Sequence, residues 1–429
     1  MKTPRLLFYI LFWTFLPLQG FADITVEECV DLAWENYPLV KKYNILTSIK
    51  EIELSDINKG WLPRMEAYAQ GTGQNIVPSY PEALKNVLQQ MGNDVKGLSN
   101  FQYKIGVDLN QTIWDGGASK VRREIENAKN DVNKASLDVE LYPVRERVEN
   151  LFFAILLTEQ QISINEQTHD LLLSNWNRLN SMVRNGIAMQ SDADMVEAEA
   201  LIVKQNLDLA RKNVETMRQV LGILVGKRLE GEKFLIPEIK PLLSAENLRP
   251  ELTLLEKRLT LNTLSDKLTE VSLMPKIGFF AQAYYGYPGF NYFKSMMNRE
   301  LSFNFLAGVR ISWNIDSFYS KKNNLRKIEL DAENILAEKD LFLFNTRMNS
   351  VAQKGKAQGL HDLMESDVKI IGLRENVRKA AESQLENGVI DATALLAKIA
   401  DENVAKLNEK YHQIEYIQEY YKFKYTLNQ

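Results

Sequence analysis

The sequence predicts an α+β fold that is mostly helical and is built from two copies of one unit. Three observations predict it: long segments with helical periodicity, four short segments in which apolar and polar residues alternate, and motifs that return later in the chain. Phe101–Val107 returns as Phe303–Val309, and Asn185-Gly186-Ile187 returns as Asn387-Gly388-Val389, both 202 residues later. One long period predicts an internal duplication, with residues 23–240 as the first copy and 241–429 as the second.

Residues 1–22 predict a secretory signal peptide. Lys2 and Arg5 precede an apolar run from Leu6 to Leu16, and Gly20-Phe21-Ala22 supplies small residues before a cleavage site. The apolar run is too short to cross a bilayer comfortably, which disfavours a membrane anchor. We therefore expect cleavage after Ala22.

The composition of the remaining chain disfavours several classes of function. Without Lys2 and Arg5, 50 Lys and Arg stand against 56 Asp and Glu, and a net charge of −6 argues against nucleic-acid binding. No stretch of about 18 apolar residues predicts a transmembrane helix. One cysteine, Cys29, and three histidines disfavour a disulfide and a zinc site, and we expect Cys29 and His169 to be packed side chains. With no nucleophile elbow or phosphate loop either, we expect no enzyme and no cofactor.

Each copy is predicted to contain a helix, two strands, a long helix, a turn and a shorter helix. The predicted helices are 27–60, 117–184 and 190–226 in the first copy, and 245–273, 318–386 and 390–425 in the second. Pro143 should kink the first long helix or open one of its backbone hydrogen bonds. In that helix, apolar and small polar residues alternate spacings of three and four, which predicts a coiled-coil seam: Ile162, Asn165, His169, Leu172, Trp176, Leu179 and Val183. Nearly 70 helical residues make a rod of roughly 100 Å, which suits spanning a distance rather than enclosing a pocket.

The strands are predicted at about 64–72, 101–113, 276–287 and 302–315. In the second and fourth strands one face is apolar: Tyr103, Ile105, Val107, Leu109, Phe305, Val309, Ile311 and Trp313. The other face is mostly polar: Gln102, Lys104, Asp108, Asn110, Asn304, Arg310, Ser312 and Asn314. Each strand alone also fits a soluble sandwich with one wet face. Their length and aromatic content match the strands of outer-membrane barrels.

Four strands are too few to cross a membrane alone. In lipid every backbone donor and acceptor must be paired, so an open four-stranded sheet is excluded. About eight strands are the minimum for a closed barrel, and more are needed for an open channel. Strands in a membrane therefore require several chains that pool them around a cyclic axis. The apolar set would then face lipid and the polar set would line a water-filled pore.

Several short motifs stand in a specific order. They are Ile24–Ala33 followed by Glu35-Asn36-Tyr37-Pro38, then Thr112-Ile113-Trp114-Asp115-Gly116-Gly117, then Arg249-Pro250-Glu251-Leu252, and the two glycine turns at 185–187 and 387–389. Each motif alone is weak. In this order, on a duplicated frame behind a signal peptide, the chain resembles the outer-membrane efflux protein family, the TolC-like channels, over essentially all of its mature length.

The resemblance implies a homotrimer in the outer membrane. Twelve pooled strands would form a transmembrane β-barrel, and long antiparallel helices would continue it as an α-helical barrel in the periplasm. It also implies an exit duct for a tripartite efflux pump or a type I secretion system, docked to a periplasmic adaptor (a membrane fusion protein) and driven by an inner-membrane transporter. Drugs, metal ions, metabolites and secreted polypeptides are all cargo of similar ducts.

The resemblance places the glycine turns at the inner tip, where adaptors make contact. Glycine suits such a turn because it adopts positive φ without a Cβ penalty. Members often carry acidic residues just after the second turn, but Ala394 and Ala397 stand at the corresponding positions here. Asp192 and Asp194, after the first turn, are the candidate acidic residues of the tip.

Two other classes of function stay open. A soluble periplasmic coiled-coil scaffold or adaptor explains the helices and the signal peptide, but not four alternating, aromatic strands in two copies. A hydrolase or lyase of the cell envelope would require a substrate pocket.

Overall fold

The computed structural model describes residues 23–92, 95–239 and 246–429, so the predicted signal peptide at 1–22 lies outside the described residues. The chain divides into two compact units. One, the hairpin unit, comprises the described residues within Met1–Val40, Asp138–Pro250 and Phe342–Gln429; the other, the sheet unit, comprises those within Lys41–Leu137 and Glu251–Leu341. Each unit therefore takes segments from both predicted copies.

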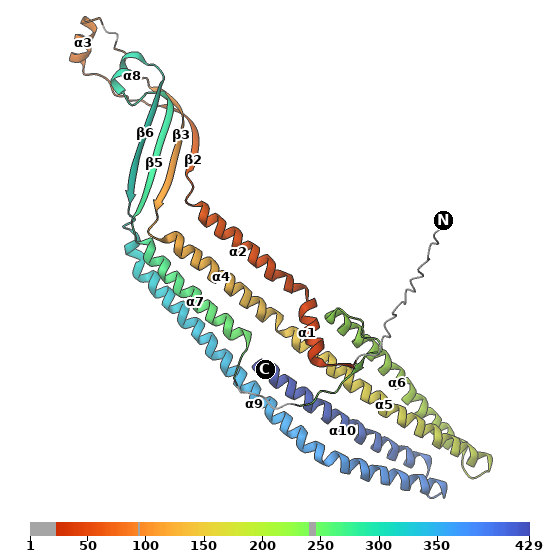
Figure 1. Ribbon diagram of the computed structural model, residues 1–429. Helices are drawn as coiled ribbons and strands as arrows, with labels where there is room; N and C mark the ends of the chain where they lie inside the picture. The colour runs from red at the N-terminus through yellow and green to blue at the C-terminus, as the bar shows by residue number, and fades with distance from the viewer. Residues whose placement is uncertain (1–22, 93–94, 240–245) are drawn as a thin grey trace, which may run out of the picture. The chain divides into compact units, whose positions relative to one another are not determined.

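The helices and strands follow one another in the predicted order, with some additions (Figure 1). The hairpin unit holds β1 (Asp23–Ile24), α1 (Val26–Asn36), most of η1 (Pro38–Lys41), α5 (Pro143–Arg184), α6 (Gln190–Val225), β4 (Lys233–Phe234) and α10 (Ala392–Leu427). The sheet unit holds α2 (Lys42–Lys59), β2 (Arg64–Gly73), α3 (Glu82–Gln90), β3 (Phe101–Trp114), most of α4 (Ala118–Leu141), most of α7 (Pro250–Ser272), β5 (Lys276–Tyr287), α8 (Tyr292–Asn298) and β6 (Ser302–Ser312). The 70-residue helix α9 (Ser317–Glu386) begins in the sheet unit and ends in the hairpin unit.

Two of the long predicted helices are interrupted at prolines. The expected helix 27–60 breaks into α1, η1 and α2, because Tyr37, the residue before Pro38, adopts an extended conformation (φ −66°, ψ 128°). The expected helix 117–184 is divided at Tyr142, and Pro143 occupies the first turn of α5. Tyr142 keeps helical angles (φ −56°, ψ −41°), so Pro143 removes a backbone hydrogen bond without turning the chain locally. The expected opening of one bond is therefore observed.

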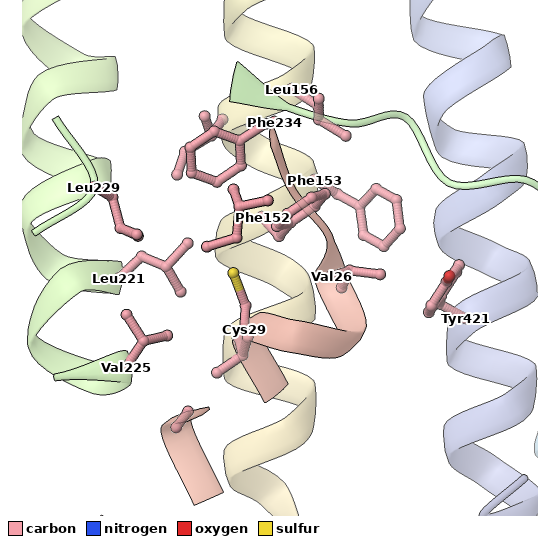
Figure 2. Packing of buried hydrophobic residues seen from close by; sticks show 14 of the residues in the cluster. Val26, Cys29, Phe152, Phe153, Leu156, Leu221, Val225, Leu229, Phe234 and Tyr421 are labelled. Carbon is pink, nitrogen blue, oxygen red and sulfur yellow. The ribbon is translucent and has the colours of Figure 1, made fainter. Parts of the chain in front are cut away.

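One core of the hairpin unit surrounds Cys29 (Figure 2). Cys29 from α1 packs in one cluster with Phe152 and Phe153 from α5 and with Leu221 and Val225 from α6. Burial, aided by the charge of nearby Glu28, raises the pKa of the Cys29 thiol to about 12, so the side chain stays protonated at physiological pH. Cys29 is a packed side chain, as expected.

A second core joins the two helix pairs α5–α6 and α9–α10. Its buried residues come from all four helices: Leu172, Leu179, Ala193, Val196, Ala200, Val203, Leu207, Ala381, Leu385, Ala392, Leu395 and Ile399. Ile162, Trp176 and Val183, three positions of the predicted seam, pack against this cluster. The apolar seam of α5 is therefore a helix-packing surface within the chain.

The sheet unit is organised by four antiparallel strands in the order β2-β3-β5-β6. β2 and β6 are the two edges. The short helices α3 and α8 lie in the connections between paired strands and were not predicted from the sequence, nor was the parallel pair β1–β4. Among the described helices, none combines the length and the apolar character that crossing a bilayer requires.

Candidate functional site

The strand register gives the sheet two chemically different faces. Cross-strand partners share parity: Val107 lies opposite Ala67 and Ala283, and Ala283 lies opposite Phe305. Side chains alternate between faces along each strand, so odd-numbered residues form one face, the odd face, and even-numbered residues form the other, the even face. The predicted apolar set up to Ile311 lies on the odd face, and the predicted polar set up to Ser312 lies on the even face.

Charge separates the two faces completely within the strands. The six charged residues of β2, β3, β5 and β6 all lie on the even face: Arg64, Glu66, Lys104, Asp108, Lys276 and Arg310. On the odd face of one isolated chain, large apolar side chains are exposed to solvent; the exposed fraction is 75% for Phe101 and 70% for Ile311. An apolar face of this extent marks a surface that lipid or another protein chain covers.

Polar and aromatic side chains form a mesh at the middle of the even face. The Gln282 amide donates to the Asp108 carboxylate at 2.8 Å and to the Tyr68 hydroxyl at 3.2 Å. The Lys104 ammonium lies over the rings of Tyr68 and Tyr284, 5.4 and 5.3 Å from their centroids. These contacts link three neighbouring strands and fix the side chains on one surface.

Gly106 is required beneath this mesh. A Cβ atom there would come within 2.7 Å of both the Ala283 carbonyl oxygen and Tyr284 Cβ, and 3.0 Å of the Tyr68 ring. The two rings therefore cover the backbone where a side chain is missing.

The fourth strand is shorter than the sequence predicts. β6 ends at Ser312, which pairs with Lys276, the first residue of β5, so the ladder has no further partner. Trp313 and Asn314 lie beyond the strand. The Trp313 indole N–H donates to the Leu273 carbonyl at 2.8 Å, and the Asn314 amide donates to Ser317 Oγ at 3.0 Å. Trp313 and Asn314, which were predicted to belong to the apolar and the polar face, therefore lie outside the paired strands and on neither face of the sheet.

The two glycine turns have the same hydrogen-bond pattern. Gly186 (φ 72°) and Gly388 (φ 69°) each donate to a carbonyl three residues back, from Val183 and Leu385. The residues that follow, Ile187 and Val389, donate to carbonyls five residues back and are 67% and 70% exposed. Asn185 and Asn387 likewise donate from their backbone N–H to Ser181 and Ser383. Nothing lies within 4 Å of a Cβ placed on either glycine, so each turn presents bare backbone and one apolar side chain.

The acidic residues after the turns act as helix caps. The Asp192 carboxylate accepts from the Met189 backbone N–H at 3.3 Å at the start of α6. At the start of α10 the Asp391 carboxylate accepts from the Ala394 N–H at 2.9 Å. The acidic residue is therefore at the N3 position of α6 and at the N-cap position of α10, the two positions whose side chains form a capping box. Asp194 accepts from the Gln190 side chain at 2.6 Å.

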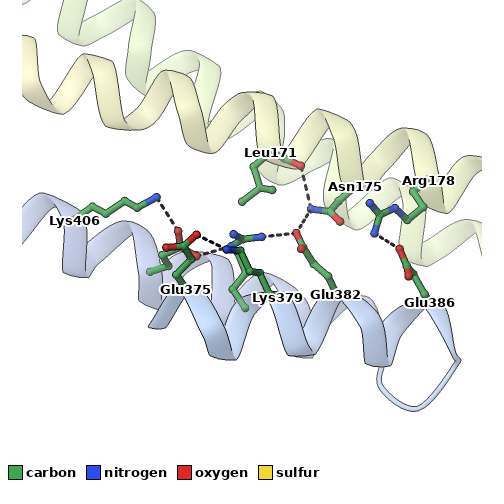
Figure 3. Close-up of polar contacts among 10 residues, drawn as sticks. Leu171, Asn175, Arg178, Glu375, Lys379, Glu382, Glu386 and Lys406 are labelled. Carbon is green, nitrogen blue, oxygen red and sulfur yellow. Dashed lines mark hydrogen bonds and ion pairs between the residues drawn. The ribbon is translucent and has the colours of Figure 1, made fainter. Parts of the chain in front are cut away.

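Ion pairs and hydrogen bonds join the helices behind the turns (Figure 3). Arg178 on α5 pairs with Glu386 on α9, and the Asn175 amide donates to Glu382 at 3.3 Å. Within the second hairpin, Arg378 on α9 contacts Glu402 on α10 at 2.5 Å. Polar contacts therefore connect α5 to α9 and α9 to α10 close to the two turns.

No group of three or more metal-ligating side chains is gathered anywhere in the described part of the chain. The features that the geometry singles out are the two-faced sheet and the paired turns.

Comparison with known proteins identifies the fold. No protein-family model matches the sequence, and no curated protein matches it significantly. Among solved structures, the outer-membrane channel OprN is 14% identical with a TM-score of 0.68, covering 94% of this chain and 89% of OprN. The outer membrane protein VceC of Vibrio cholerae is 10% identical with a TM-score of 0.67, covering 94% of each chain. The CmeC outer membrane channel of Campylobacter jejuni is 11% identical with a TM-score of 0.65, covering 100% of this chain and 93% of CmeC.

At these identities the likeness concerns the fold, and it extends over nearly the whole chain in each pair. The chain has the fold of the TolC-like outer-membrane efflux channels that its sequence motifs resemble.

Proposed function

We propose that this chain is a homotrimeric outer-membrane channel, the exit duct of a tripartite efflux pump or a type I secretion system. It passes cargo across the periplasm and the outer membrane. The observation that carries the proposal is the antiparallel sheet with one apolar face, one charged face and two unpaired edges.

The edges explain why copies must associate. Three successive antiparallel pairings connect β2 to β6, so these two edge strands run in opposite directions. β6 of one copy beside β2 of the next therefore continues the sheet as an antiparallel ladder. Head-to-tail addition of this kind closes into a ring and pairs every edge, which a lipid environment demands.

The even face favours more than two copies. Eight strands enclose an interior that side chains just fill. The even face carries several long side chains, among them Tyr68, Lys104, Phe280 and Arg310. Twelve strands from three copies leave room for water above these side chains, and the polar lining keeps the pore wet.

The paired turns suit docking of a periplasmic adaptor. They expose Ile187 and Val389 beside bare glycine backbone, so a partner helix can approach closely. An inner-membrane transporter would supply the energy for export through that adaptor.

Substitution of Gly388 by valine tests the docking role. A β-branched residue at φ 69° is strained by about 1–2 kcal/mol and adds bulk to an open surface. We expect export of a known pump substrate to be lost in cells that express only this variant, while trimers still reach the outer membrane.

Two variants control for strain and for the change of residue. Gly388→Asn keeps the turn, because asparagine tolerates positive φ, but still adds a side chain to the open surface, so reduced export in this variant too would assign the loss to bulk rather than to strain. Gly355→Val makes the same change on the exposed surface of α9, where a Cβ meets nothing within 4 Å, and should be silent. Normal export in the Gly388→Val strain would exclude the turn as an adaptor contact.

A further inference from the structure

The even face carries an excess of positive charge. Four cations, Arg64, Lys104, Lys276 and Arg310, stand against two anions, Glu66 and Asp108. Since all six residues share one face, each chain brings two net positive charges to that surface.

The register concentrates three of the cations at one end of the sheet. Lys276 lies opposite Ser312, Arg310 lies opposite Gly278 one row further, and Arg64 lies opposite Asn110 in the row after that. Glu66 and Asp108 lie opposite one another in the next row. We call Arg64, Lys276 and Arg310 the cationic end; it borders a hollow of about 650 Å³ that these three residues help to line.

The charge of the cationic end is not neutralised by ion pairs. No carboxylate of a described residue lies within 4.0 Å of Arg64, Lys276 or Arg310. The Arg310 guanidinium instead lies 4.7 Å from the centroid of the Phe280 ring, which holds the cation in place without cancelling its charge.

The carboxylates that border the same hollow are Glu53, Asp56 and Asp115. Two of them are engaged elsewhere. Asp56 pairs with Lys59 at 2.8 Å, and Asp115 accepts from the backbone N–H groups of Gly117 and Ser119 at 3.1 and 2.7 Å. With Arg122, which lines the same hollow, four cations stand against these three carboxylates, so the hollow keeps a net positive charge that a mobile anion can meet.

We propose that the cationic end selects for anionic cargo, namely small molecules that carry carboxylate, sulfonate or phosphate groups. The inference rests on the proposed channel function, with the even face lining the pore. Three copies would bring nine such cations to three neighbouring rows at one end of the barrel. A ring of like charge in a low-dielectric wall raises the local concentration of counter-ions and sets the sign of the permeating species.

The test measures ion selectivity of the full chain in planar lipid bilayers under a potassium chloride gradient. The triple variant R64Q, K276Q, R310Q should shift the reversal potential toward the value for cations, with the chloride-to-potassium permeability ratio falling about threefold or more. The difference between wild type and variant should shrink at high salt, because the screening length falls from about 10 Å at 0.1 M to about 3 Å at 1 M.

Two controls isolate the effect of charge at this place. Arg310→Lys keeps the charge and should leave the ratio unchanged. Lys233→Gln removes an exposed cation in the hairpin unit and should also leave it unchanged. A current whose permeability ratio is the same in wild type and triple variant overturns the selection of anions and leaves the channel intact. Trimers that carry no current contradict the channel proposal itself.

Discussion

Substitution of Val107 by arginine is expected to destabilise the proposed trimer by about 2–4 kcal/mol, because we propose that the odd face meets lipid, where a charge near the middle of the bilayer costs this much. Val107 lies on the odd face in the middle of β3, between Ala67 and Ala283 on the neighbouring strands. No carboxylate shares this face within the strands, so an arginine there has no partner. The measurement is the urea concentration that dissociates and unfolds the detergent-solubilised protein.

Leu306→Arg is the matched control. Leu306 is also apolar and exposed, but it lies on the even face, one row from the row of Val107, beside Gln282. The same change of residue at nearly the same depth should cost little, because the arginine would meet water beside the polar Gln282, on the face that carries the carboxylates of Asp108 and Glu66. Equal losses in the two variants, or a greater loss in Leu306→Arg, would reverse the assignment of the faces.

Substitution of Arg378 by methionine is expected to destabilise the protein by up to about 3–5 kcal/mol, the penalty for leaving a buried charge uncompensated, of which Lys406 beside Glu402 offsets a part. Arg378 is 9% exposed, and it contacts Glu402 on α10 at 2.5 Å and Glu382 at 2.8 Å. Glu402 is 4% exposed, so in the variant its carboxylate keeps only Lys406, at 2.7 Å. Methionine preserves the volume of the stem, and the loss is therefore electrostatic.

Two further variants separate burial from ion pairing as such. Arg374→Met breaks a pair of similar length, 2.7 Å to Asp401, but both side chains are at least 40% exposed and the loss should stay below about 1 kcal/mol. The double variant Arg378→Met with Glu402→Met removes both buried charges and should recover part of the stability lost in the single variant. If the double variant lost more free energy of unfolding than the two single variants lose together, the α9–α10 contact would not depend on this buried ion pair.

The alternation of the strands could be predicted because it is a local pattern. Period two is visible in Phe101–Leu109 and Phe303–Ile311, and the register then brought those residues onto common faces. The end of β6 could not be predicted, because the pattern continues through Trp313 and Ile315 while the partner strand begins at Lys276. A strand ends where its partner does, which is a property of the pair.

The turns were also visible in the sequence, since glycine at a helix end predicts positive φ. The capping roles of Asp192 and Asp391 were only weakly indicated by the sequence, through an acidic residue at one of the two capping positions of the helix that follows each turn. Nothing in the sequence indicated the polar contacts between α5 and α9. Asn175 and Glu382 are 207 residues apart, and only the packing of α5 against α9 brings them together. Helix breaks at Pro38 and Pro143 followed proline chemistry, but only the second was foreseen.

The proposed channel requires three copies of the chain to pool their strands in the outer membrane. The most direct measurement is the native mass of the full chain extracted in mild detergent from separated inner-membrane, outer-membrane and soluble fractions. We expect a species of three chains, each of 49.3 kDa before any cleavage, in the outer-membrane fraction. A monomer or dimer in the soluble fraction would show that the odd face is not in lipid, and would favour a periplasmic scaffold instead.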